Sequence, residues 1–193
     1  MSIRIPLIST VSAAVLVCGS SFALQDKTAP PKGKPTEASM PMPKPTQEHA
    51  WLKPRIGTWE ATVSCPMMGE PTKATETARA FGDFSVVADF QGQMMGQDFT
   101  GLSVMTYDPV RKKYVSTWCD TLYPGIAVFE GTVDASGKKL TSTGKAPNME
   151  GALVDFTSVL EVQGPDAATF TMYETSKGAS DASAMHIDYK RKK

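Results

Sequence analysis

Sulfur is the most unusual chemical feature of this sequence. Residues 48–193 hold eight methionines, Met67, Met68, Met94, Met95, Met105, Met149, Met172 and Met185. Thioether and thiolate sulfur select soft metal ions such as Cu(I), whereas flexible methionine side chains also fill irregular cores and line adaptable pockets. We favour the packing interpretation and expect no resident metal. The two Met-Met pairs fall in predicted loops, which would form an apolar rim if both loops lie at one mouth of a barrel.

Two cysteines, Cys65 and Cys119, follow the N-terminal region. In an oxidising compartment two thiols can pair. A disulfide needs its Cα atoms within about 4.4–6.8 Å of each other, and the sequence does not give that distance. A Cys65–Cys119 disulfide, two buried free thiols and a reactive thiol pair therefore stay open as alternatives.

Trp118 and Asp120 are separated by one residue, so they share one face of a predicted strand. A carboxylate beside an indole inside a pocket could orient the polar head of a ligand. The same spacing also fits a pair on the outer surface, or a buried Asp120 bonded to threonine hydroxyls. All three interpretations remain open from the sequence.

Catalytic motifs are missing from the sequence. Two histidines are too few for a convincing Ser-His-Asp arrangement, and no nucleophile elbow is present. Neither a phosphate-binding glycine loop nor zinc-ligand spacing occurs. We therefore assign no catalytic residues and expect a non-enzymatic role. An enzyme would need a reactive carboxylate in a pocket, for which Asp120 and Glu130 are the candidates.

Period-two alternation dominates the chain from residue 56 onward and predicts the elements that position these side chains. Short strands with turn signals between them, and none of the spacing of parallel βαβ units, indicate an all-β antiparallel up-and-down barrel. One short helix is expected over residues 47–53. About ten strands are predicted, over residues 56–64, 72–81, 84–90, 99–107, 114–121, 126–133, 139–144, 152–162, 169–175 and 184–191.

The first 23 residues are typical of a secretory signal peptide. Arg4 is the only charge, an apolar stretch covers residues 5–17, and small residues precede a predicted cleavage after Ala23. The stretch is shorter than the roughly 20 residues of a transmembrane helix. Cys18 offers a lipoprotein-anchor alternative, which the bulky Val17 disfavours. We expect an exported protein, periplasmic or extracellular.

Residues 24–47 are rich in proline and lysine and predict a disordered linker, so the folded domain is expected over residues 48–193. The whole chain balances 20 basic against 20 acidic side chains. Without a basic excess, nucleic-acid binding has no electrostatic basis. No second apolar run is long enough to span a bilayer.

Several short motifs resemble the bacterial family called domain of unknown function 1579. The resemblance covers essentially all of the predicted domain, and it implies no activity and no catalytic residues. The matching pieces are Leu52, Gly57-Thr58-Trp59, Met95-Gly96, Phe99-Thr100-Gly101, Tyr107-Asp108-Pro109, Lys113-Tyr114-Val115, Trp118-Cys119-Asp120, Gly131-Thr132-Val133-Asp134 and Tyr189-Lys190-Arg191.

The same opening and ending are similar to the wider calycin group of lipocalins, fatty-acid-binding proteins and nitrobindins. That likeness implies a barrel closed by Trp59 packed against Arg191. Nitrobindins hold haem through a late histidine, so the likeness also suggests haem binding by His186. Alternation opposes this, because it places His186 on the strand face away from Arg191.

Together these observations predict non-catalytic binding of a small hydrophobic or amphipathic molecule inside the barrel. The alternatives are a haem protein using His186, and an envelope-associated interaction module with a solid barrel and a functional linker. The candidate ligand-binding residues are Phe84, Phe99, Met105, Trp118, Asp120 and Phe129.

Overall fold

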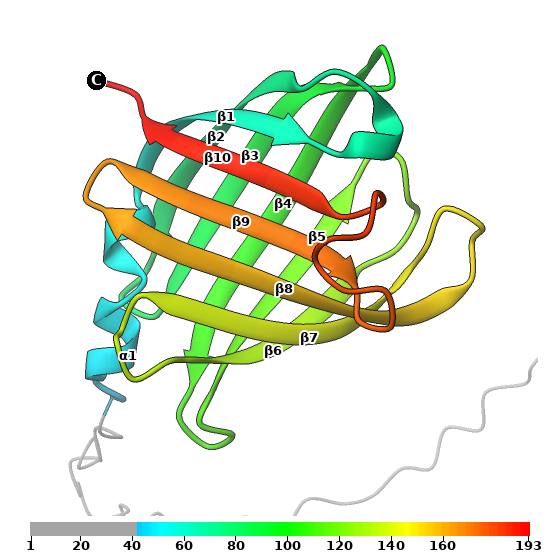
Figure 1. Ribbon diagram of the computed structural model, residues 1–193. Helices are drawn as coiled ribbons and strands as arrows, with labels where there is room; N and C mark the ends of the chain where they lie inside the picture. Colours follow the sequence, from blue (N-terminus) through cyan, green and yellow to red (C-terminus); the bar gives the residue numbers. More distant parts are fainter. Residues whose placement is uncertain (1–41) are drawn as a thin grey trace, which may run out of the picture. The chain divides into compact units, whose positions relative to one another are not determined.

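A computed structural model describes residues 42–193; the predicted signal peptide and most of the predicted linker lie outside them. Ten antiparallel strands form the domain (Figure 1), which confirms the predicted fold class. Their bounds are β1 (Gly57–Ser64), β2 (Thr72–Phe81), β3 (Ser85–Met94), β4 (Gln97–Asp108), β5 (Lys113–Asp120), β6 (Ala127–Val133), β7 (Lys139–Pro147), β8 (Leu153–Gly164), β9 (Ala167–Glu174) and β10 (Met185–Arg191).

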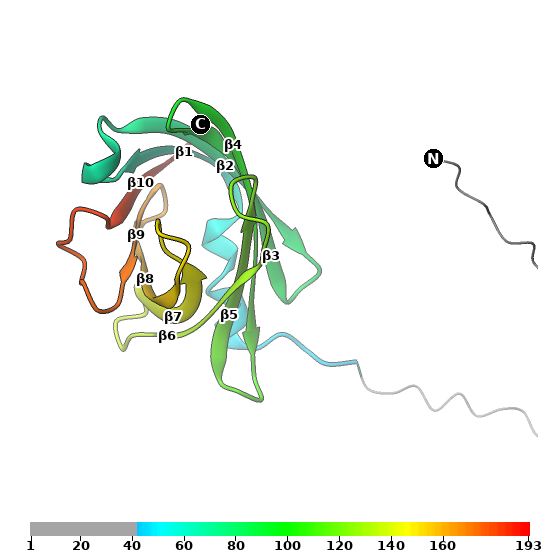
Figure 2. The ribbon, with the colours of Figure 1, turned by 90° about the vertical axis from the view of Figure 1, so that its right-hand side faces the viewer.

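Each strand pairs with the next along the chain, and β1 pairs with β10 to close the barrel. In that closing ladder Trp59 lies opposite Arg191 and Val63 lies opposite Ile187. Closure gives every strand two hydrogen-bonded neighbours, so no open sheet edge remains. The strands of the predicted up-and-down barrel thus form a continuous ring, seen from one end in Figure 2.

Alternation along each strand decides which side chains face inward. In β1, Trp59 and Ala61 are buried whereas Glu60 is exposed; in β10, Tyr189 is buried whereas Lys190 is exposed. The interior is therefore built from every second residue of each strand, as the period-two pattern predicted.

The two ends of the barrel differ in their connections. Hairpins at residues 82–84, 109–112, 134–138 and 165–166 occupy one end, which we call the closed end. Connections at residues 65–71, 95–96, 121–126, 148–152 and 175–184 occupy the other, which we call the open end. Both Met-Met pairs belong to the open end, as a shared mouth requires.

The segment before β1 lies across the closed end (Figure 1). It forms helix α1 (Gln47–Ala50) and the 3₁₀ turn η1 (Lys53–Arg55), in place of the single helix expected over residues 47–53. The Trp51 indole donates a 2.8 Å hydrogen bond to the Gly137 carbonyl, and the Tyr114 hydroxyl donates one of 3.0 Å to the Glu48 carbonyl. These bonds join the segment to the hairpins that it covers.

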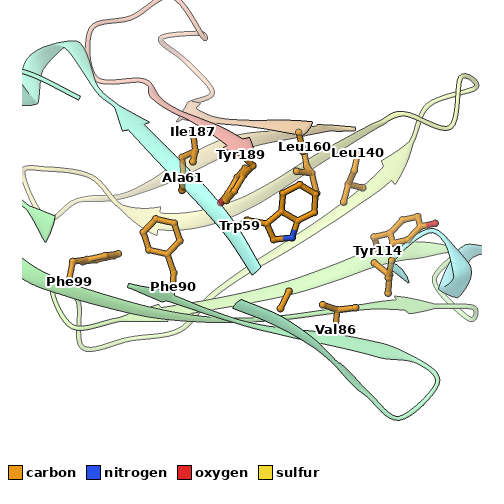
Figure 3. Close-up of a cluster of buried hydrophobic side chains, with 13 residues drawn as sticks. Trp59, Ala61, Val86, Phe90, Phe99, Tyr114, Leu140, Leu160, Ile187 and Tyr189 are labelled. Atoms are coloured by element: carbon orange, nitrogen blue, oxygen red, sulfur yellow. The ribbon is translucent and has the colours of Figure 1, made fainter. Parts of the chain in front are cut away.

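Trp59 is the centre of the packed core near the closed end (Figure 3). Its side chain is only 2% exposed and meets the Tyr189 ring edge-on at 6.5 Å between centroids. The Arg191 guanidinium lies 4.2 Å from the centroid of the indole, as the calycin likeness implied. Arg191 also donates to the carbonyls of Pro54 and Ile56, at 2.7 and 2.9 Å. This cation–π stack ties the last strand to the start of the first.

No helix within residues 42–193 combines the length and the apolar character needed to cross a membrane.

Candidate ligand-binding cavity

A cavity of about 400 Å³ runs through the barrel interior. Side chains from all ten strands border it, and most of them are apolar. Leu52 and Arg55, from the segment that covers the closed end, border it at its floor. Met149 and Tyr123, from open-end loops, border it at its mouth. The interior is therefore hollow, and a solid barrel is not what the sequence builds.

Three aromatic side chains form a cluster on one wall of the cavity. The rings of Phe99 and Trp118 are stacked, with centroids 6.3 Å apart. Phe90 meets Phe99 edge-on at 6.0 Å and Trp118 edge-on at 6.2 Å. A Cβ atom on Gly101 would overlap the Trp118 ring, so the indole depends on the glycine beneath it. Such a wall offers flat apolar surface to a ligand.

Asp120 fixes the position of the Trp118 indole. The Trp118 Nε1–H donates a 2.7 Å hydrogen bond to Asp120 Oδ2. Asp120 Oδ1 accepts from the backbone N–H groups of Leu122 and Tyr123, at 2.8 and 2.9 Å. The carboxylate therefore orders both the aromatic wall and the start of the 121–126 loop. With three donors already bonded to it, its task in this geometry is positioning.

Sulfur gathers around the same space. Seven of the eight methionines of the domain border the cavity, and so does Cys65; Met95, exposed at the tip of the 95–96 turn, does not. The sequence analysis anticipated an apolar rim from the two Met-Met pairs, but it did not predict which of the other methionines would face the interior.

A charged network lies at the floor. The Arg55 guanidinium forms an ion pair with the buried Glu76, and Tyr189 donates a 3.0 Å hydrogen bond to Glu76 Oε2. Arg55 also lies over the rings of Trp59 and Tyr189, at 5.3 and 4.8 Å. Burial, followed by the negative charge of Glu76, raises the pKa of Tyr189 well above its usual value. The hydroxyl therefore stays protonated and continues to donate.

Five of the six candidate ligand-binding residues border the cavity: Phe99, Met105, Trp118, Asp120 and Phe129. Phe84 does not border it. Phe84 lies in the turn before β3, where its ring packs edge-on against His49 at 5.3 Å, beneath α1. Phe84 therefore belongs to the packing beneath the covering segment at the closed end, whereas Val86 and Phe90 of the same predicted face border the cavity.

The two cysteines are free, so the disulfide alternative is wrong for this structure. Cys65 is buried beside the cavity, where its thiol donates to the carbonyls of Ala182 and Ser183, both at 3.7 Å. Cys119 lies between the inward-facing Trp118 and Asp120 and therefore points away from the interior, toward the Leu102 carbonyl at 3.8 Å. The wall of the barrel separates the two thiols.

His186 alternates with the cavity-lining Met185 and Ile187 and is not itself among the lining residues. Its Nδ1 lies 3.1 Å from the Thr171 hydroxyl, which belongs to the neighbouring strand. The histidine therefore sits on the outer wall, as its alternation predicted.

Sequence reasoning missed the network of Arg55, Glu76 and Tyr189. The charged residues and threonines of the stretch 72–81 favour a solvated strand, which hides the buried acid within it. The available signal was the alternation of Ala74, Glu76 and Ala78, which marks an inward face of small residues with one acid among them. Within residues 42–193, no three His, Cys, Asp or Glu side chains gather as metal ligands would.

Comparison with solved structures finds several similar chains, all of low sequence identity. A de novo designed fluorescence-activating β-barrel is 16% identical, with a TM-score of 0.42, covering 71% of this chain and 93% of that chain. The redesigned barrel mFAP0, bound to DFHBI, is 12% identical, with a TM-score of 0.39 and coverage of 70% and 97%. The S-type phycobiliprotein lyase CPES from Guillardia theta is 10% identical, with a TM-score of 0.49 and coverage of 77% and 94%.

No curated protein matches the chain significantly. A family model described as "Protein of unknown function (DUF1579)" matches residues 44–191, which includes every strand of the barrel. The chain therefore belongs to the DUF1579 family.

Proposed function

We propose that the barrel binds one small hydrophobic or amphipathic molecule in its interior and performs no chemistry on it. The observation that carries this proposal is the apolar cavity of about 400 Å³, which has a mouth at the open end. Its volume falls in the range of about 300–1,000 Å³ that is usual for ligand sites. The Phe90, Phe99 and Trp118 wall supplies rigid contact area.

An amphipathic ligand suits this cavity better than a purely apolar one. Ser103, Ser116, Ser142 and Ser158 border the cavity and bring hydroxyl groups into its apolar lining. A hydroxyl can both donate and accept a hydrogen bond, so these side chains can hold a ligand's polar group without demanding a charge.

Two adjacent residues of β4 provide a matched test. Ser103 borders the cavity, whereas Leu102 points outward and is 39% exposed. We expect Ser103→Phe to fill the cavity and to weaken binding of a fluorescent apolar probe such as 1-anilinonaphthalene-8-sulfonate by about tenfold or more, equivalent to about 1.4 kcal/mol. Leu102→Phe should bind like the wild type. Equal affinities in two folded variants would overturn the proposal.

If Ser103→Phe does not fold, Ala88→Leu at another cavity-lining position serves as the blocking variant. Native mass spectrometry of protein purified from its source complements the titration, because a bound molecule adds a discrete mass to the intact chain. That mass should vanish after extraction with organic solvent.

Export is also part of the proposal, supported by the sequence of residues 1–23. N-terminal sequencing should then find Leu24 first, and recovery of a chain that retains Met1 would oppose it.

A further inference from the structure

The methionines of this domain concentrate around the cavity. Met94, Met105 and Met185 are partly buried and pack against the hydrophobic core. None of the eight is as deeply buried as the leucines, valines and aromatic residues that form that core. Seven methionines also border the cavity, so sulfur-bearing side chains make up a large part of its lining.

Cys65, which follows β1, Met185 of β10 and Met172 of β9 occupy neighbouring positions on one side of the mouth, and all three border the cavity. Met172 and Met185 are directly opposed partners in the β9–β10 ladder, and both border the cavity. Directly opposed residues have Cβ atoms about 4.5–5.5 Å apart. Methionine has an unbranched side chain with three rotatable bonds, so two such thioethers can converge on one point.

Cys65 joins this pair from the end of β1. The β1–β10 ladder runs from Trp59 opposite Arg191 to Ser64 opposite His186, and Cys65 is the next residue beyond it. Its thiol lies 3.7 Å from the carbonyls of Ala182 and Ser183, which come shortly before β10. The Met67 N–H donates a 3.0 Å hydrogen bond to the same Ala182 carbonyl. These bonds hold the thiol beside the start of β10, next to Met185.

From this placement we propose that Cys65, Met172 and Met185 form a binding site for a monovalent soft metal ion, Cu(I). One thiolate and two thioethers are ligands that select Cu(I) over hard divalent cations. On binding, the Cys65 thiol gives its proton to solvent and its sulfur bonds to the metal, which changes no oxidation state. The thiolate neutralises the charge of Cu(I), and this neutrality suits an apolar site because an unpaired buried charge is costly.

The experiment is an anaerobic titration of the purified full chain with Cu(I), using bicinchoninate as competing chelator. We expect one Cu(I) per chain and an ultraviolet thiolate-to-copper absorption band. Loss of a partner that only orients a metal ligand already costs about 10–100-fold in affinity. Cys65→Ser should therefore lower the affinity by about 100-fold or more and remove the band. The double variant Met172→Leu with Met185→Leu should lower it by about tenfold or more.

Matched controls are available in the same chain. Cys119→Ser removes a thiol from the outer wall, and Met95→Leu removes an exposed thioether that does not border the cavity. Both should bind Cu(I) like the wild type. Leucine replaces methionine at similar volume, usually at less than about 1.5 kcal/mol, so the double variant should stay folded. Absence of Cu(I) binding, or binding that survives Cys65→Ser, would overturn the proposal.

This site does not depend on the proposed carrier function. Titration of the same variants with the fluorescent apolar probe, without copper, measures the cavity separately. Probe binding together with copper affinity that is insensitive to Cys65→Ser would refute the metal site alone. Copper binding without probe binding would refute the carrier function alone.

Discussion

The two ends of the barrel place the same side chain in opposite settings. At the closed end, the Trp59 indole is almost fully buried and donates to the Arg55 carbonyl at 2.8 Å, with guanidinium groups against its ring. Nearer the open end, the Trp118 indole donates to Asp120 at 2.7 Å and borders the cavity among phenylalanines. Both indoles have a satisfied N–H, so hydrogen bonding does not distinguish them.

What surrounds each indole makes the difference. Trp59 lies beneath the covering segment 47–55, where Arg55, Glu76 and Arg191 join distant parts of the chain. Trp118 lies next to a loop and borders the cavity, so it is only partly buried. The closed end thus provides stability, and the open end leaves the cavity accessible. Predictions that separate stability from binding test this division.

The largest effect is expected from removing the closed-end indole. Trp59→Ala should lower the free energy of unfolding by about 5 kcal/mol, at the upper end for buried aromatic truncations, because it also removes the stacking partner of Arg55 and Arg191. Trp118→Ala should cost about 2 kcal/mol, less than a fully buried aromatic, since its ring already faces a cavity, but should weaken apolar-probe binding more strongly. Urea denaturation and probe titration measure the two quantities. Equal losses of stability would contradict the division between the ends.

A smaller loss is expected from breaking the floor ion pair. Arg55→Met should destabilise the fold by about 3 kcal/mol, because it leaves the Glu76 carboxylate buried with Tyr189 as its remaining donor. Adding Glu76→Leu removes the orphaned charge and should restore most of that loss. If the double variant is no more stable than Arg55→Met in urea denaturation, the cost lies in lost stacking on Trp59 and Tyr189.

Alternation alone was enough to predict the walls of this molecule. It indicated the strand count, the inward faces of β1 and β10, and the outward direction of His186. Alternation could not exclude the disulfide, because the sequence left open which face of its strand Trp118 occupies. Cys65 shares the face of Trp59, whereas Cys119 lies on the face opposite to Trp118. Once the structure shows Trp118 facing the cavity, the two thiols are seen to lie on opposite surfaces of the barrel, and both are free.

The floor and the sulfur-lined mouth could not be predicted in this way, because both depend on closure. Glu76 becomes buried only when the barrel places it opposite Trp59 and near Tyr189 and Arg55, which are distant along the chain. Likewise, Met172 and Met185 become neighbours through the pairing register of β9 and β10, which the sequence of the connecting loop 175–184 does not predict. Local pattern gives the direction of a side chain but not its cross-barrel partner.

The next largest effect is expected from alkaline pH, which should lower the free energy of unfolding through the closed end. Burial raises the pKa of Tyr114 to about 12, and that of Tyr189 rises well above its usual value. Both folded-state pKa values exceed the unfolded value of about 10, so the stabilisation is complete below about pH 10 and is lost as the pH rises through the folded-state values. For Tyr114 the loss should fall between about pH 10 and about 12, at most about 2 kcal/mol after solvent screening. Urea denaturation at about pH 9, 10 and 11 measures it.

Tyr114→Phe is the control for that pH dependence. The variant loses the hydrogen bond to the Glu48 carbonyl and should be about 1 kcal/mol less stable at about pH 9. Its stability should then decline less steeply with pH than that of the wild type, because one of the two titrating hydroxyls is gone. Parallel declines in the two proteins would show that Tyr114 does not contribute to the alkaline sensitivity of the closed end.

The smallest effect is expected on the outer wall, which belongs to neither end. The His186 ring contacts the Thr171 hydroxyl, so His186→Ala should change the free energy of unfolding by about 1 kcal/mol or less and leave apolar-probe binding unchanged. Mixing the wild type with haemin should give no Soret shift that depends on His186. A shift that His186→Ala abolishes would mean that the outer wall, and not the cavity, holds the functional ligand. In that case the division between a stabilising closed end and a binding open end would lose its meaning, because an axial histidine on the outer wall would bind independently of both.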